Sequence, residues 1–195
     1  IPILLAGTGT NTLDLNSNTL TYTDASAARI YVSGRTFNIL GGGNFTNNVI
    51  NTIDLSGDSI LNLNGSTITH VTQSIHINDD VDADKGISSN SDSIINTLVM
   101  DASAAFIGTA KTTVTNGFDV NANTLNIGNT GTLDCDASIT LNTVNSKLLF
   151  SDAGRVDCPV VIRAKPNVGK GIDVDASGAR MNGDLRVDNS GNINI

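Results

Sequence analysis

The sequence predicts an all-β protein whose chain coils as a parallel β-helix, a β-solenoid with about 23 residues per coil. Two observations carry this prediction. Apolar residues flank a single polar residue again and again, and helical spacing is not sustained anywhere. In addition, a glycine returns about every 23 residues, a period typical of repeat architectures, at Gly42, Gly65, Gly86, Gly108, Gly131, Gly154 and Gly178.

The glycine series predicts a corner at the same place in every coil. Glycine permits a positive φ or a tight turn that other residues resist. The two best-preserved copies are Gly131-Thr132-Leu133-Asp134-Cys135 and Gly154-Arg155-Val156-Asp157-Cys158. A chain that turns at the same place in each copy stacks one copy on the next.

The apolar-polar-apolar pairs predict short strands. Period-two alternation places both apolar residues of a pair on one face of a strand. The pairs that follow Gly131 are Leu133/Cys135, Ile139/Leu141 and Leu148/Phe150, and those that follow Gly154 are Val156/Cys158, Val160/Ile162 and Ile172/Val174. Each coil is therefore expected to hold three strands, with its inward side chains stacked in aliphatic columns.

Polar residues are expected to form the remaining corners. Asp-Ala-Ser recurs at Asp24, Asp101, Asp136 and Asp175, and aspartate followed by small residues is a good turn former. Asparagine is frequent and tolerates left-handed backbone, so it suits repeated turns. Regularly spaced apolar residues throughout the chain argue against a disordered polar tract.

Composition excludes several classes of partner. The formal net charge is −8 and the pI is near 4.4, which argues against nucleic acid and against an anionic membrane surface. No apolar run is long enough to span a bilayer, so no membrane insertion is expected. Because the chain begins with Ile1 and not Met, either a leader has been removed or the chain is a segment of something longer.

The chain is expected to form one elongated domain, residues 1–195, with residues 1–10 as a candidate strand between subunits. Both ends are apolar, and no amphipathic capping helix is evident. Unpaired terminal coils offer strand edges to other chains. The candidate assembly residues, through which copies of the chain would join as a homo-oligomer or filament, are Ile1, Ile3, Leu4, Leu5, Ile193 and Ile195.

The acidic segment from Asp79 to Asp84 has two interpretations. It resembles the start of a calcium loop, but Lys85 and Ser91 stand where an EF-hand loop needs Gly and Glu. Asp80, Asp82 and Asp84 are either Ca²⁺ ligands in another geometry or part of a solvated acidic loop. No other cofactor is expected.

Cys135 and Cys158 are the only cysteines and lie one period apart. On neighbouring coils their Cα atoms would lie about 4.8 Å apart, the separation of paired strands, which a disulfide accepts. The alternatives are a disulfide and a pair of buried thiols that pack as small apolar residues.

Catalytic signals are weak, and the chain is not expected to be an enzyme. Aspartates that lie between two apolar residues include Asp54, Asp119, Asp134, Asp157 and Asp173. Such outward carboxylates serve solubility, Ca²⁺ binding or glycoside hydrolysis. The chain has no Trp for a sugar platform, and its only tyrosines are Tyr22 and Tyr31. Its only histidines are His70 and His76, and the sequence contains no Gly-x-Ser-x-Gly motif that would supply a nucleophilic serine.

The glycine-marked copies and the paired apolar residues together resemble the right-handed parallel β-helix superfamily, the pectin-lyase-like fold. That superfamily includes polysaccharide lyases and hydrolases, phage tailspikes and bacterial surface adhesins. The stretch from Gly171 to Asp188 is also similar to the glycine-punctuated strands of phage fibre proteins. This second resemblance makes an intertwined trimeric β-fibre an alternative fold, beside a β-sandwich.

We expect a structural subunit of an extracellular filament or fibre that self-assembles end to end through strand pairing. One alternative is a phage tail fibre, tailspike or surface adhesin that binds a host glycan or receptor. The other is a polysaccharide lyase or hydrolase. All three interpretations place the chain outside the cell, at the cell surface or on a virion.

Overall fold

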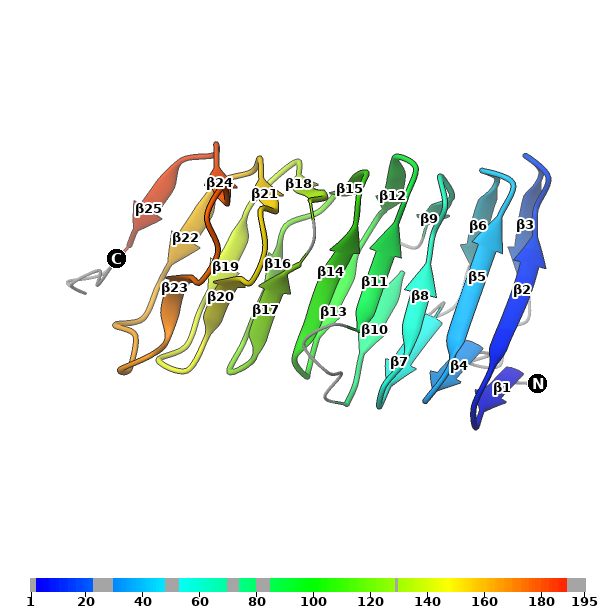
Figure 1. Cartoon of the computed structure of the whole chain (residues 1–195), viewed down its shortest axis with the longest axis horizontal. Coiled ribbons are helices and arrows are strands. Elements are labelled where there is room, and N and C mark those ends of the chain that lie inside the picture. Colours follow the sequence, from blue (N-terminus) through cyan, green and yellow to red (C-terminus); the bar gives the residue numbers. More distant parts are fainter. Residues whose placement is uncertain are drawn as a thin grey trace.

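The chain forms a single stack of coils in the computed structural model, which describes residues 3–22, 30–47, 53–69, 74–79, 85–128 and 130–188. Every secondary-structure element in these ranges is a strand, and every strand pairing is parallel. Figure 1 shows the strands following one another along the long axis, from β1 at one end to β25 at the other. The prediction of an all-β parallel β-solenoid with about 23 residues per coil is confirmed.

Each coil contributes three strands, one to each of three faces, so strands three apart in sequence pair with each other. Coil one holds β1 to β3, coil two holds β4 to β6, and the count continues to coil eight with β22 to β24. Sheets of eight strands therefore span seven turns. The three strands per coil that the sequence predicts are present.

The first face is built from two sheets. The upstream sheet contains β1 (Ile3–Ala6), β4 (Ile30–Ser33), β7 (Ile53–Ser56), β10 (Ile75–Ile77) and β13 (Leu98–Met100). The downstream sheet contains β16 (Phe118–Asp119), β19 (Ile139–Leu141), β22 (Val160–Ile162) and β25 (Leu185–Val187).

The other two faces are continuous sheets of eight strands. The second face contains β2 (Thr10–Asp14), β5 (Thr36–Leu40), β8 (Ile60–Asn62), β11 (Gly86–Ser89), β14 (Ala104–Gly108), β17 (Thr124–Ile127), β20 (Lys147–Phe150) and β23 (Gly171–Val174). The third face contains β3 (Thr19–Tyr22), β6 (Asn44–Asn47), β9 (Thr67–Thr69), β12 (Ser93–Ile95), β15 (Lys111–Val114), β18 (Thr132–Cys135), β21 (Arg155–Val156) and β24 (Arg180–Met181).

The backbone ladder of the first face is interrupted between β13 and β16. In the described ranges no strand pairing joins these two strands, whereas β14 pairs with β17 and β15 pairs with β18 on the other faces. The step from β11 to β14 is also short, because Gly86 pairs with Ala105, only 19 residues later. One face of the rod is therefore discontinuous while the other two are not.

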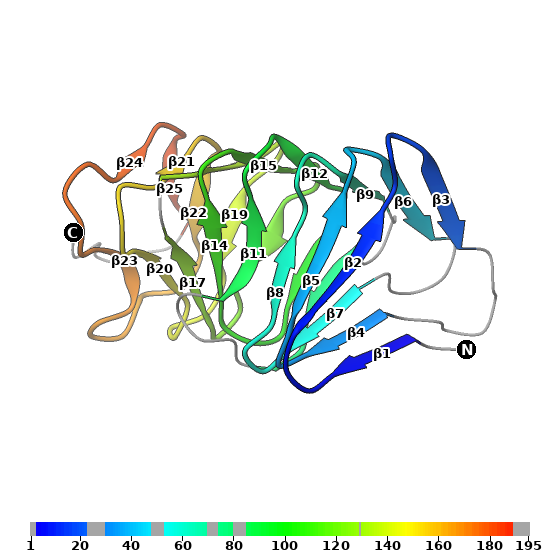
Figure 2. The same cartoon turned by 45° about the vertical axis from the view of Figure 1, so that its right-hand side comes forward.

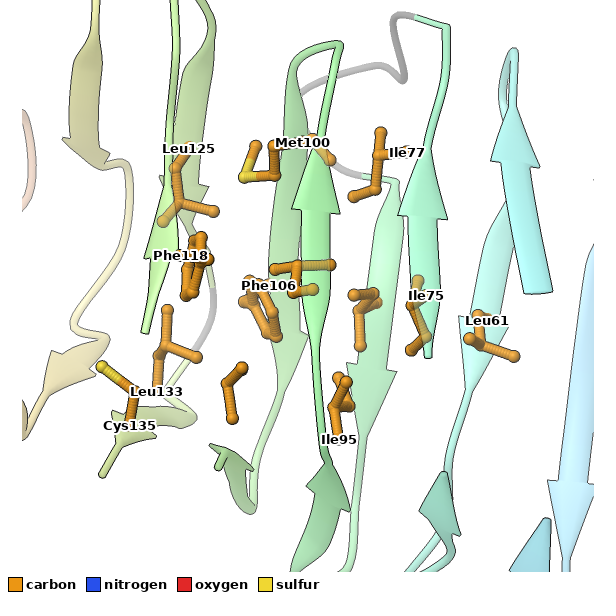
Figure 3. Close-up of a cluster of buried hydrophobic side chains, with 14 of the residues drawn as sticks. Leu61, Ile75, Ile77, Ile95, Met100, Phe106, Phe118, Leu125, Leu133 and Cys135 are labelled. Atoms are coloured by element: carbon orange, nitrogen blue, oxygen red, sulfur yellow. The ribbon is translucent and has the colours of Figure 1, made fainter. Parts of the chain in front are cut away.

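The core is a continuous column of aliphatic side chains inside the coils. Ile53, Ile75 and Leu98 stack in register on the first face, and Leu61 and Ile87 stack on the second. All five are buried. Figure 3 shows such side chains, including Phe106 and Phe118, filling the interior between the faces. Burial of this apolar surface is the main term that stabilises the stack.

The corner between the second and third faces explains most of the glycine series. Gly42, Gly65 and Gly178 have positive φ there, and Gly131 and Gly154 lie at the same corner in coils six and seven. Gly108, at the end of β14, also has positive φ, and a Cβ on it would lie 2.3 Å from the Ser89 carbonyl oxygen. A side chain at this position would therefore collide with the backbone of the coil before it.

Gly86 departs from the prediction. It begins β11 and does not form the corner of coil four, which runs through Asn90, Ser91 and Asp92. A Cβ on Gly86 would lie 2.4 Å from the Ala105 carbonyl oxygen of the next coil. A glycine is thus required at this position because two strands approach closely there, and not because the chain turns.

Polar corners follow the sequence prediction where the structure describes them. Asp101, Asp136 and Asp175 each begin a link between two strands. Asn16, Asn64 and Asn121 adopt positive φ in turns. Asp24 lies outside the described residues.

The parallel pairing throughout the described chain excludes the β-sandwich alternative. Each coil pairs with the next coil of the same chain, unlike the strands of an intertwined trimer.

Candidate functional site

The predicted assembly residues are described only in part. Ile1, Ile193 and Ile195 lie outside the described residues, and for Ile3 only its backbone position in β1 is given. Leu4 is 69% exposed and Leu5 is half-buried. Because Leu5 pairs in register with the buried Val32, it is the first member of an inward column. Leu4 alternates with it and faces outward.

The core is uncovered at the N-terminal end of the described chain. Leu20 of β3 belongs to an inward column that continues to Ile68, Ile95 and Val114, all buried. Leu20 itself is 40% exposed, because no described coil lies on its outer side. Figure 2 shows β1, β2 and β3 at this end of the stack.

The core is also uncovered at the C-terminal end of the described residues. An apolar hollow of about 130 Å³ lies between coil seven and the last strands, lined mainly by Phe150, Ile172, Val174, Met181 and Leu185. Ile172 and Met181 are half-buried and Val174 is 53% exposed. The sequence predicts Val174 as the inward partner of Ile172, and no described strand covers it on the outer side of coil eight.

A polar cluster crosses three coils on the outer side of the first face. His76 of β10 contacts Asp54 of β7 through Nδ1 at 3.2 Å and Asp101, next to β13, through Nε2 at 2.9 Å. The Asp54 side chain is fully buried, whereas that of Asp101 is 60% exposed. Hydrogen bonding to Asp54, reinforced by Asp101, raises the pKa of His76 against the opposing effect of burial.

This cluster favours the protonated imidazolium, which donates from both ring nitrogens. A histidine that acts as general base needs one nitrogen free to accept a proton, and both nitrogens of His76 already face carboxylates. The chemistry that the arrangement supports is therefore cross-linking of coils three, four and five by charge-assisted hydrogen bonds.

The sequence predicts the contact between two members of this cluster but not the third. Ile53-Asp54-Leu55 and Ile75-His76-Ile77 are the same motif one period apart, and the structure pairs Asp54 with His76 in register. Asp101 could not be found in this way, because it lies in a corner outside any strand. The sequence prediction treated it as a turn former only.

The outward aspartates of the third face are each paired with a cation. The Asp134 carboxylate contacts Lys111 Nζ at 2.6 Å, and Asp157 receives two hydrogen bonds from Arg155. Arg155 lowers the pKa of Asp157, and Asp134 raises the pKa of Lys111. Paired in this way, Asp134 and Asp157 fit the solubility interpretation better than a shared proton or a bound cation.

The remaining predicted residues are placed as follows. Cys135 and Cys158 are free, buried thiols in this structure. A hydrogen bond to Cys158 and burial raise the pKa of Cys135, which keeps the thiol protonated.

The candidate calcium ligands Asp80, Asp82 and Asp84 lie outside the described residues. Within the described ranges, no group of three or more His, Cys, Asp or Glu side chains is placed to hold a metal ion.

Comparison of the chain with protein families, with curated proteins and with solved structures gives no match. The resemblance to the pectin-lyase-like superfamily and to phage fibres therefore remains a prediction. The structure supports the coarser statement that the chain is a parallel β-solenoid. In the described part of the chain, no helix is both long and apolar enough to cross a membrane.

Proposed function

We propose that this chain is a structural, non-enzymatic subunit of an extracellular filament or fibre. Subunits join end to end, with the last coil of one stacked on the first coil of the next. The observation that supports this proposal is the incomplete burial of inward side chains at both ends of the stack. Leu20 at one end and Ile172 and Met181 at the other belong to columns that are fully buried in the middle coils.

The two end faces are compatible with each other. At one end β1, β2 and β3 present their outer edges, and at the other end β25, β23 and β24 present theirs, on the same three faces. Stacking would extend every sheet with further parallel pairs, in the manner of strand addition. It would also cover the apolar hollow beside Phe150 with apolar side chains of the first coil.

Such a contact joins two different surfaces, so it is heterologous. A heterologous contact that does not close into a ring produces an open filament. A stack of coils has its next binding face on the same axis as the previous one, and this geometry favours a filament over a ring.

The test is the size of the purified chain, measured by sedimentation velocity and electron microscopy over a range of concentrations. We expect concentration-dependent rods that grow in length at constant width. A charge placed on one end face, Leu20→Lys, should shift the distribution to single subunits, because lysine cannot be buried unpaired in the junction. A strictly monomeric wild-type chain at high concentration contradicts the proposal.

Matched controls are available within the chain. Leu40 is 37% exposed, close to the value for Leu20, but it lies at the end of β5 in coil two and away from the end face. Leu40→Lys should therefore leave assembly unchanged. At the other end, Val174→Lys should block assembly, and Val144→Lys in the link between β19 and β20 should not. Assembly that responds equally to all four substitutions is not end-to-end stacking.

A further inference from the structure

The two cysteines of the chain occupy consecutive places in one inward column of the third face. Val114 of coil five lies opposite Cys135 of coil six, in the pairing of β15 with β18. In the pairing of β18 with β21, Leu133 lies opposite Val156. The same register, continued by two residues, places Cys135 opposite Cys158 of coil seven. We propose that Cys135 and Cys158 form a disulfide that ties coil six to coil seven when the chain is exposed to a small disulfide oxidant.

Both thiols lie inside the coils and contact each other. Cys135 is 4% exposed and Cys158 is 1% exposed, and their thiols are in hydrogen-bond contact. Figure 3 shows Cys135 among the buried side chains of the core, beside Leu133. Paired strands lie about 4.8 Å apart, within the range of about 4.4–6.8 Å that a disulfide accepts between its two Cα atoms.

The backbone ladder between coils six and seven stops before it reaches this pair. β15 and β18 pair over four residues, but β18 and β21 pair over two, because β21 ends at Val156. Pro159 follows Cys158 and has no amide hydrogen to donate. The Cβ atoms of a disulfide lie about 3.8 Å apart, closer than those of residues opposite each other in a parallel ladder, so the bridge needs a small approach of the two chains. The end of β21 leaves the Cys158 backbone less constrained for this approach.

The cover over Cys158 on the other side is thin. The register of β21 with β24, continued by two residues, places Gly183 of coil eight opposite Cys158. A Cβ on Gly183 would lie 2.0 Å from the Cys158 carbonyl oxygen, so backbone and not a side chain covers this place in the column. Met181 beside it is half-buried. Local opening of coil eight therefore breaks few buried contacts and exposes Cys158 to a reagent.

The chemistry is thiol–disulfide exchange in two steps. The Cys158 thiolate attacks one sulfur of oxidised glutathione, which forms a mixed disulfide and releases one reduced glutathione. The Cys135 thiolate then attacks the Cys158 sulfur and releases the second. The two cysteines lose two protons and two electrons, and the oxidised glutathione takes them up as it becomes two reduced molecules. Because the pKa of Cys135 is raised while the pair is buried, exchange should be slow until coil eight opens.

The experiment incubates the purified full chain, first reduced, with oxidised and reduced glutathione in native buffer over a range of ratios. We expect mass spectrometry to show the loss of two hydrogen atoms per chain without a glutathione adduct, and a tryptic product that joins residues 112–147 to residues 156–163. The bridge closes a loop of roughly 23 residues in the unfolded chain, so it should raise the midpoint of thermal unfolding by about 6–12 °C. The proposal does not depend on end-to-end assembly, because both cysteines belong to one chain.

The matched control combines Val114→Cys with Cys135→Val. It keeps two inward thiols in the same column but separates them by two coils, about 9.6 Å, beyond the limit of about 7 Å for a disulfide. We expect no bridge in native buffer, whereas in urea this variant and the wild-type chain should both oxidise.

Four results would overturn the proposal. The wild-type chain could keep free thiols or carry only glutathione adducts in native buffer while it oxidises in urea. The bridge could form between chains. The control could form its bridge to the same extent as the wild-type chain. The bridged chain could unfold at the same temperature as the reduced chain.

Discussion

Coil four and coil eight have the same architecture but differ in how completely they are buried. In coil four, Ile75 lies between Ile53 of coil three and Leu98 of coil five and is fully buried. In coil eight, Ile172 stacks on Leu148 of coil seven and has no described strand on its other side, so it is only half-buried. A solenoid core is thus a property of neighbouring coils and not of any single coil.

The largest expected difference between the two regions concerns the aliphatic column. Ile75→Ala should lower the free energy of unfolding by about 2–5 kcal/mol, because it removes buried surface and leaves a cavity enclosed by two coils. Ile172→Ala should lower it by about 1 kcal/mol, because that side chain is already partly solvated. Urea denaturation monitored by circular dichroism measures both values. Equal losses would show that coil eight is covered in solution.

Much of the column was predictable from the sequence, since Ile75 and Ile172 lie in the same alternating pattern. The difference in their burial was not predictable, because alternation reports which face a residue occupies and not what lies on the next coil. The same limit applies to Gly86. Its spacing fits the corner series, but the step from β8 to β11 is long, because Ile60 pairs with Gly86, 26 residues later, and the corner of coil four therefore lies beyond Gly86.

A second difference is expected at the glycines. Gly108→Ala should cost about 3 kcal/mol, because φ is 112° and the new Cβ would lie 2.3 Å from the Ser89 carbonyl oxygen. Gly178→Ala has a similar φ of 91°, but its nearest neighbour is the Ala153 side chain at 3.4 Å. It should cost about 1 kcal/mol, from backbone strain alone. Thermal unfolding of the two variants compares them directly, and equal costs would mean that the backbone of coil four moves aside.

The third difference is a dependence on pH that only the middle coils should show. The pKa of His76 is raised in the folded state, so its contribution to stability is fully present below the unfolded value of about 6.5. It is lost as pH rises through the higher folded value. His76→Gln should therefore cost about 1–3 kcal/mol at pH 5 and less at pH 9. A loss independent of pH would show that the imidazolium is not the stabilising form.

The smallest effect is expected for an ion pair of the last coil. Lys147 Nζ contacts the Asp173 carboxylate at 2.7 Å, and the Asp173 side chain is 41% exposed. Lys147→Met keeps the aliphatic stem and should change the free energy of unfolding by less than about 1 kcal/mol, with the difference disappearing in high salt. A loss as large as that of His76→Gln at pH 5 would contradict the contrast between a covered and an exposed coil.

The candidate sites were less accessible to sequence reasoning than the fold. Asp54 and His76 occupy equivalent positions in neighbouring copies, so their contact follows from the period. Asp119 occupies such a position too, but the interruption of the ladder between β13 and β16 beside it does not follow from the period. No local pattern in the sequence marks this interruption of the ladder.

The interrupted ladder has a mechanical consequence. Elsewhere in the described chain three ladders of backbone hydrogen bonds join successive coils, but between coils five and six only two are described, β14 with β17 and β15 with β18. These bonds run along the rod, since strands of neighbouring coils lie one above the other. Under tension applied to its two ends, the rod should part first at this joint, into an upstream piece of five coils and a downstream piece of three.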